Sequence, residues 1–399
     1  MFLRDRSWIG AWHETGAIGQ SSTYYLGAVA ATLSALTSAN QKRVSKSNPE
    51  GKHTSPQANS GASRIIWTAA IFSLPHLLGQ LIGFLLTSRS SPPGLHLFWG
   101  YLALGQVVIL LSVSIGWLCG AVLSRISSII VSGGGWVLLI AASDAGPINV
   151  VMRGRPEMAV DSFALAIRAM AVSALLASLA WTTSKNTACQ RLPRLVPTSV
   201  ATILVVASFS YGADVVKLRI PPEASALCIS GRVRICVWPE QEKYLVDLAH
   251  TSARIDALPD VFEKPYEINS TGLKGTDNQA SQRSGRESEP SPTFEIIGGS
   301  IWSYAGAFAA AIERETFRFT DELCQWRNLS PADDRRLLVL DAWLEAYLAG
   351  NGQPDYRTNA PPSIQGAFLE GRAIANGRTA SDQFKWAEKE VIEMRQRYC

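Results

Sequence analysis

Cys228 and Cys236 are the residues whose type and spacing most directly suggest chemistry in this sequence. They enclose the strand-like stretch CISGRVRIC, which continues as VWPE. A three-residue turn centred on Arg232 would place the two cysteines opposite each other on adjacent strands, at a Cα separation that a disulfide accepts. Such a bond persists only in an oxidising compartment. We therefore expect a disulfide if this part of the chain lies outside the cytoplasm, and two free thiols if it lies inside.

Other uses of the cysteines remain open. Either member of the pair could instead join Cys324 or Cys399, and a metal or redox site is a further alternative. The pair is not a CxxC motif, and His250 is the only histidine after residue 216, so a zinc site would lack a second imidazole. We expect Cys119 and Cys189 to stay reduced.

Patterns for nucleotide-driven or hydrolytic chemistry are absent from the sequence. It contains no Walker A pattern, no HExxH and no GxSxG, and TGLKGT lacks the Walker A spacing. No basic stripe interleaved with aromatic residues suggests a nucleic-acid partner. We therefore expect that the protein is not an enzyme and binds no cofactor or metal. If its function requires energy, a partner protein must supply it.

Three polar residues fall inside long apolar segments. His76 follows Pro75 midway along one segment, Gln80 lies one helical turn later, and Arg168 lies partway into another. Ionisable groups at such depths are costly and are functional-site hypotheses by default. The structural alternatives are that His76 bonds a carbonyl freed by Pro75 and that Arg168 extends toward the outer headgroups. No acidic relay accompanies them, which argues against ion coupling.

The elements that must position these residues are six apolar segments, at 22–39, 65–87, 97–122, 126–143, 160–182 and 196–213. Several exceed the roughly 18 residues typical of a transmembrane helix. Residues 1–216 carry 7 Asp and Glu against 15 Lys and Arg, whereas residues 217–399 carry 26 and 22. The pattern predicts a membrane α-helical bundle of about six transmembrane helices over 22–216, in contact with the lipid bilayer. In the third segment, Gly116 and Gly120 have the spacing that lets two helices pack closely, with a gating role as the alternative.

Positive charges in the short loops predict the orientation of this bundle. Nine Lys and Arg lie on the side of residues 40–64, 125 and 184–195, and five lie on the other side. The richer side should be cytoplasmic. Residues 1–21 and 217–399 should then be extracytoplasmic, in a multi-pass protein of the cell membrane. Residues 1–21 have no apolar signal-peptide core, so either the first span inserts in reverse or a preceding helix is missing.

Residues 217–399 have the composition of a soluble domain, and their pattern predicts a mixed α/β extracytoplasmic domain. β-Formers on both sides of Ser230 and Gly231 suggest a hairpin. The polar tract 270–293 predicts a disordered insertion. Charge runs such as 333–336 are interpreted as solvated faces without function. Helices are expected over 240–258, 300–319, 331–350 and 381–397.

Several stretches together resemble a known group of bacterial membrane proteins. They are WIGAWHETGAIGQ, a basic QKR, SIGWLCGAVLSRISSIIVSGGGWVLL and CISGRVRICVWPE. This order is similar to that of ABC-2-type permease-like, or ABC transporter-associated, proteins with an extracytoplasmic C-terminal domain. Similar proteins carry a further helix before the region of Trp8 and Trp12, which implies that it is missing here, and a histidine where this chain has Trp238.

The resemblance implies a membrane subunit that works with a separate cytoplasmic ABC ATPase, as a homo- or hetero-dimer, in an export or self-protection system. The second hypothesis is a non-transporting membrane protein whose extracytoplasmic domain senses or binds a ligand, peptide or envelope component. A co-purifying ATPase would favour transport, and normal export without the chain would favour the second hypothesis.

Overall fold

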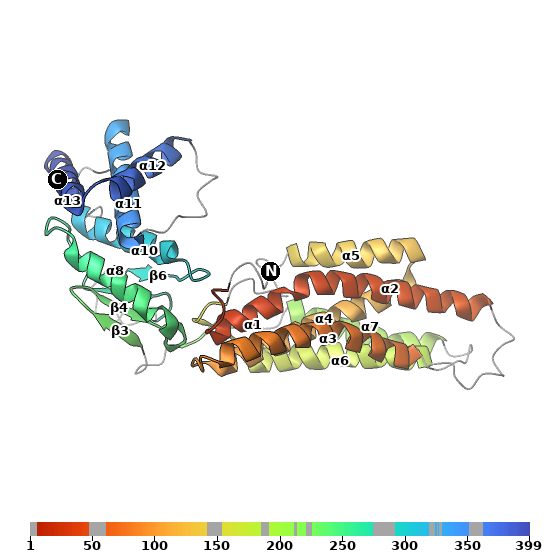
Figure 1. The fold of residues 1–399 in the computed structure, drawn as a ribbon. Helices are drawn as coiled ribbons and strands as arrows, with labels where there is room; N and C mark the ends of the chain where they lie inside the picture. The colour runs from red at the N-terminus through yellow and green to blue at the C-terminus, as the bar shows by residue number, and fades with distance from the viewer. Residues whose placement is uncertain are drawn as a thin grey trace, which may run out of the picture. The chain divides into compact units, whose positions relative to one another are not determined.

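The computed structural model describes most of the chain, which forms two compact units, residues 1–219 and 220–399 (Figure 1). Each unit is described by itself. The described residues are 6–47, 61–141, 154–184, 191–210, 214–220, 226–273, 292–318, 324, 326, 329–350 and 362–399.

The first unit is built from helices that run along one another and alternate in direction (Figure 1). Gly116 and Gly120 lie against Ala31 and Ala35 in the same order, so α2 and α4 run in the same direction. Thr87, near the end of α3, meets Thr15 of α1, so α3 runs the opposite way. The helices are α1 (Trp12–Ser21), α2 (Thr23–Ser47), α3 (Gly61–Ser88), α4 (Leu95–Val122), α5 (Arg125–Ala141), α6 (Ser162–Ser184) and α7 (Arg191–Ser210), and β1 (Met158–Val160) pairs antiparallel with β2 (Val216–Leu218).

Three of these helices are long and apolar enough to cross a membrane, which indicates membrane association. They are α3, α4 and Ser162–Thr183 of α6, whereas α5 and Val196–Ser210 of α7 are apolar but shorter. The first expected segment, 22–39, lies within α2, which is rich in Ala, Ser and Thr and therefore falls below the apolar content of a membrane span. The described residues thus form a helical bundle in which three helices have membrane length and apolar composition, and the six transmembrane helices expected from the sequence are not confirmed.

Helix α1 lies where the sequence predicted an N-terminal segment outside the bundle. Nearly all of its side chains are buried, and it contacts α3 and α4. Glycine explains this burial, because a Cβ at Gly16 would lie 3.0 Å from the Cβ of Tyr101, and a Cβ at Gly19 would overlap the carboxamide of Gln80. Small residues at these positions let polar α1 enter the bundle, although the segment lacks the apolar content that sequence reasoning relied on.

The second unit combines a small mixed sheet with helices around a hydrophobic core. Strands β3 (Leu227–Ser230) and β4 (Arg234–Val237) are antiparallel, and β5 (Glu267–Ser270) and β6 (Thr293–Phe294) continue the sheet in parallel. A 3-10 turn, η4 (Pro239–Tyr244), precedes the helices that the structure describes in this unit: α8 (Leu245–Ala257), α10 (Ile301–Phe317), α11 (Pro331–Ala349), α12 (Pro362–Gly377) and α13 (Ala380–Tyr398). The sequence did not predict α12, and most of the expected insertion 270–293 lies outside the described residues.

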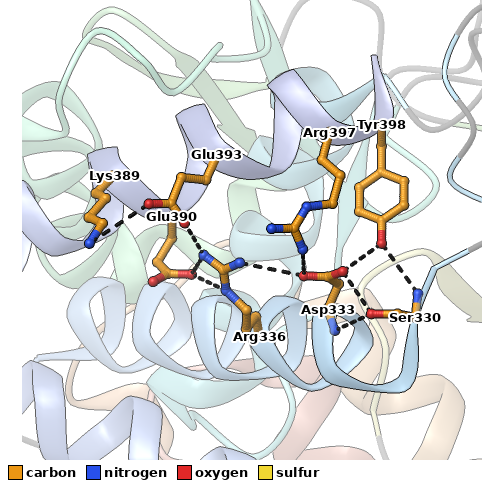
Figure 2. Close-up of polar contacts among 8 residues, drawn as sticks. All are labelled: Ser330, Asp333, Arg336, Lys389, Glu390, Glu393, Arg397 and Tyr398. Atoms are coloured by element: carbon orange, nitrogen blue, oxygen red, sulfur yellow. Dashed lines mark hydrogen bonds and ion pairs between the residues drawn. The ribbon is translucent and has the colours of Figure 1, made fainter.

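The charge run 333–336 is only partly the solvated face that the sequence suggested, because Asp334 and Arg335 are exposed whereas Asp333 is buried and Arg336 is half-buried. Ser330 caps α11 by accepting the Asp333 N–H at 3.1 Å, and the Asp333 carboxylate accepts from Tyr398 at 2.7 Å and from Arg397 at 2.6 Å (Figure 2). Arg336 reaches Glu390 and Glu393 on α13 at 2.7 Å each. Hydrogen bonds from Tyr398 and Ser330, followed by the Arg397 guanidinium, hold the pKa of Asp333 well below its usual value. Asp333 and Arg336 therefore join α11 to α13, through partners more than fifty residues away in sequence.

Candidate functional site

The second half of helix α3 has polar side chains inside the bundle and apolar side chains outside. Its buried positions are His76, Gln80, Gly83 and Thr87, which follow one another at helical spacing. Large apolar residues on the other side of this half are exposed on the surface of the first unit; they include Leu74, Leu77, Leu78, Leu81, Ile82 and Leu85. This inverted pattern suits a helix whose outer surface is covered by lipid.

The polar stripe of α3 faces α1. The hydroxyls of Thr15 and Thr87 lie 2.7 Å apart, and the Gln80 amide donates to the Gly16 carbonyl at 3.3 Å. The Thr15 methyl lies 3.0 Å from where a Cβ on Gly83 would sit. We call this contact the α1–α3 seam; it comprises Thr15, Gly16 and Gly19 on α1 and His76, Gln80, Gly83 and Thr87 on α3.

His76 lies at the inner end of the seam and is 1% exposed. Its Nε2 fills the space above Gly105 of α4, where the methyl of Thr23 also lies, and the backbone of Leu102 is close to the ring. Within the described part of the chain, neither ring nitrogen makes a hydrogen bond of good geometry. His76 therefore makes no hydrogen bond to a carbonyl freed by Pro75, which was the structural role considered for it from the sequence.

The first long helix has a one-residue break in its α-helical hydrogen bonding close to His76. Helix α1 ends at Ser21 and α2 begins at Thr23, while Ser22 keeps right-handed helical backbone angles and donates its N–H to the Gly19 carbonyl at 3.3 Å. Ser21, Ser22 and Thr23 each donate a hydroxyl hydrogen bond to the carbonyl three residues earlier, at 2.8, 2.6 and 2.7 Å. Hydroxyls that bond back to the main chain in this way are associated with bends in helices. The chain therefore continues from α1 into α2 with a local irregularity beside Thr23, whose methyl lies next to the same glycine as His76.

Aromatic residues locate this break relative to a bilayer. On α6, exposed Phe163 and Trp181 are 18 residues apart, or about 27 Å at 1.5 Å per residue. On α3, Trp67 and Phe84 are 17 residues apart, or about 26 Å. Aromatic belts lie at the two interfaces of a bilayer whose hydrocarbon core is about 30 Å thick. His76 lies nine residues after Trp67 and eight before Phe84, and hence near the middle of the spanning part of α3.

Arg168 lies away from the α1–α3 seam, on α6. Its guanidinium packs 4.8 Å from the ring centre of Phe209, its Nε donates to the Ser208 carbonyl at 3.4 Å, and it interacts electrostatically with Asp214. Only five residues separate it from Phe163, at the start of α6. These contacts tie α6 to the end of α7 and agree with an arginine directed toward the nearer headgroups.

Gly116 and Gly120 lie where the backbones of α4 and α2 approach each other closely. A Cβ at Gly116 would overlap the Ala31 carbonyl, and one at Gly120 would overlap the Ala35 carbonyl. Small residues on both helices therefore let the backbones of α2 and α4 touch. This position is a packing contact, and it leaves no room for a side chain at either glycine.

The structure joins Cys228 and Cys236 in a disulfide, directly opposite each other in the β3–β4 register with Cα atoms 4.1 Å apart. It joins Cys324 to Cys399 in a second disulfide, a pairing that sequence reasoning did not consider. Cys119 is free, and Cys189 lies outside the described residues. In the described ranges, no group of three or more His, Cys, Asp or Glu could hold a metal ion.

Sequence reasoning found His76 and Gln80 but missed the other members of the seam that make its hydrogen bonds, Thr15, Gly16 and Thr87. The available signal was the helical spacing of 76, 80, 83 and 87 in a segment that is otherwise apolar. The partner helix α1 could not be inferred, because the contacts join residues 64 and 72 positions apart. Comparison with models of protein families, with curated proteins and with solved structures gives no match for this chain.

Proposed function

We propose that this chain is the permease-like membrane subunit of an ABC-type export or self-protection system, energised by a separate cytoplasmic ATPase. The observation that carries the proposal is the set of buried polar residues His76, Gln80 and Thr87 along a membrane-length helix, with His76 near its middle. Transporters commonly form their substrate sites from polar groups near the bilayer midplane. The identity of the ATPase partner, and assembly as a dimer, rest on the sequence resemblance alone.

The proposed orientation places residues 220–399 outside the cytoplasm. It rests on the excess of Lys and Arg in the loops on the opposite side, and the two disulfides are compatible with it. Tags after Gln41, within 274–291 and at the C-terminus test it directly. Protection of the tag after Gln41 and exposure of the other two, in intact cells, is the expected result.

Isolation of the tagged full-length chain from its native membranes tests the transport assignment. We expect an ABC ATPase to co-purify, and its ATP hydrolysis to change when the complex is reconstituted in lipid. A chain that purifies without any ATPase, together with unchanged export after its deletion, would overturn the proposal.

The second candidate is a non-transporting membrane protein whose outer domain binds a ligand, peptide or envelope component. It is favoured by the second unit, which has its own hydrophobic core and two disulfides. Retained ligand binding by residues 220–399 alone, with normal export in a strain without the chain, is the outcome that would select it.

A further inference from the structure

The α1–α3 seam is held by few hydrogen bonds for a buried polar contact. Several of its neighbouring polar atoms make no hydrogen bond within the part of the chain that the structure describes; they are Nδ1 and Nε2 of His76, Oε1 of Gln80 and the hydroxyl of Tyr101. Polar groups left without partners inside a membrane protein are costly. If water enters the seam, it supplies hydrogen-bond partners for these groups. An open, hydrated seam is therefore less unfavourable than the opening of a purely apolar contact would be.

Among the described residues, no carboxylate forms an ion pair or hydrogen bond with His76, and the buried carboxylate of Glu157 interacts electrostatically with Tyr101 instead. Among the helices packed against α3, α4 presents the neutral phenol of Tyr101 one residue from Leu102, and α1 carries His13 and Glu14 at its far end. On α6, Arg168 faces α7 instead. A proton on His76 in the closed seam would therefore be a buried charge without a hydrogen-bonded counterion, which is strongly unfavourable.

Opening the seam to water removes that penalty, so proton binding and opening favour each other. Coupling of this kind is reciprocal: if an open seam binds a proton at His76 more tightly, then the bound proton favours the open seam to the same degree. The proton comes from bulk water and forms an N–H bond on the imidazole. No other reactant is needed.

The contacts on the two sides of the break at Ser22 indicate which part can move. Helix α2 is fixed to α4 by backbone contacts at Gly116 and Gly120. Helix α1 meets α3 through side chains, namely the Trp12–Phe84 ring contact at 5.2 Å and the polar pairs of the seam, and water can replace the partners in the polar pairs. The Thr15 hydroxyl also contacts the Trp8 carbonyl at 3.1 Å. The seam would therefore open at the end of the bundle where α1 begins.

We propose that His76 is a proton-binding site whose protonation opens the α1–α3 seam to water from the end of the bundle at which α1 begins. This inference deepens the proposed function, because the seam would regulate water access to the same mid-membrane site. Only the biological role of the opening rests on the proposed function. The opening itself requires no ATPase.

The test measures the access of water-soluble reagent to a seam residue as a function of pH. Thr87→Cys serves as the reporter, because cysteine is similar in size to threonine. Thr87 is fully buried against Thr15, so a thiol at this position reacts only when the seam opens. The full-length chain, with Cys119 and Cys189 replaced, is reconstituted in lipid nanodiscs and treated with a charged, membrane-impermeant methanethiosulfonate. Ser90→Cys, at an exposed position just beyond α3, gives the intrinsic pH dependence of thiol reaction. Leu85→Cys, on the lipid-facing side of the same helix, is the matched negative control.

We expect the rate at Thr87→Cys, divided by the rate at Ser90→Cys, to rise about tenfold between about pH 7.5 and about pH 5.5, a size common for coupling between sites. Adding His76→Gln should abolish the rise, and Leu85→Cys should stay unreactive throughout. A flat ratio with His76 intact overturns the proposal, and so does an equal rise with His76→Gln. The first of these outcomes needs no His76 variant, so the proposal stays testable even if that variant misfolds. The two tests are independent. A flat thiol-reaction ratio would not bear on co-purification of an ATPase, and purification without an ATPase would not change the thiol-reaction ratio.

Discussion

Removing the Cys324–Cys399 disulfide should destabilise the second unit more than removing the Cys228–Cys236 disulfide. The first bond closes a loop of 75 residues and the second a loop of 8. In the chain-entropy model, the longer loop stabilises by about 4.5 kcal/mol and the shorter by about 2.5 kcal/mol at 25 °C. The expected difference in the free energy of unfolding is therefore about 2 kcal/mol.

The comparison uses the two double variants Cys324→Ser/Cys399→Ser and Cys228→Ser/Cys236→Ser in the full-length chain, so that neither leaves an unpaired thiol. Amide hydrogen exchange of buried residues of α11, such as Trp343 and Leu344, reports the free energy of opening when exchange requires global unfolding of the unit. Exchange should be about thirtyfold faster in the first variant than in the second, since each 1.4 kcal/mol is about tenfold.

The contacts between α11 and α13 make the result informative. The hydrogen bonds of Asp333 with Arg397 and Tyr398 remain when the nearby disulfide is removed, so α13 keeps its folded position and the loss comes mainly from the unfolded chain. Equal exchange rates in the two variants, or faster exchange in Cys228→Ser/Cys236→Ser, would show that the entropy of loop closure does not set the difference in stability.

Three further substitutions test the packing and the electrostatics. Gly116→Leu should place a side chain against the Ala31 carbonyl and cause aggregation in size-exclusion chromatography, whereas Gly135→Leu, whose Cβ would meet open space, should not. The pKa of Asp333 is lowered by its hydrogen bonds, so its contribution is present above its unfolded pKa of about 3.9 and is lost as the pH falls through the folded pKa. Denaturant titration should therefore show Asp333→Asn less stable than the parent at neutral pH, with the two converging only in strong acid. Burial raises the pKa of Glu313, so the stability linked to its proton is present below about pH 4.3 and is lost as the pH rises through the folded pKa; Glu313→Gln should unfold with less dependence on pH above that range.

The sequence predicted helices well where a single physical signal dominated. Helices α3 and α4 begin and end within four residues of the segments 65–87 and 97–122. A long continuous apolar run predicts a helix of this kind whatever its tertiary neighbours are. The β3–β4 hairpin was similarly local, since β-formers surround a short turn. In the first unit, α1 was missed because its burial depends on glycine contacts with α3 and α4 rather than on its own composition.

Nonlocal partners account for the other differences. Nothing near Cys324 in the sequence indicates that it pairs with Cys399, at a separation of 75 residues. Asp333 was interpreted as solvated because its own helix offers only Arg336 as an ionic partner, whereas Arg397 and Tyr398 come from α13. The chemical role of a charged residue was thus fixed by the tertiary fold, which the local pattern does not contain.

The two halves of the first long helix differ in how they are held, and this difference decides which half can move. Helix α2 touches α4 through main-chain atoms at Gly116 and Gly120, where no water fits between the backbones. Helix α1 is joined to α3 by a hydroxyl pair, one amide–carbonyl bond and the ring contact of Trp12 with Phe84, and water can replace the partners in the two polar contacts. Separation of α2 from α4 would lose close packing without any substitute, whereas separation of α1 from α3 would lose one ring contact and exchange its polar partners for water. A conformational change in this bundle should therefore begin with α1 and pivot at Ser22.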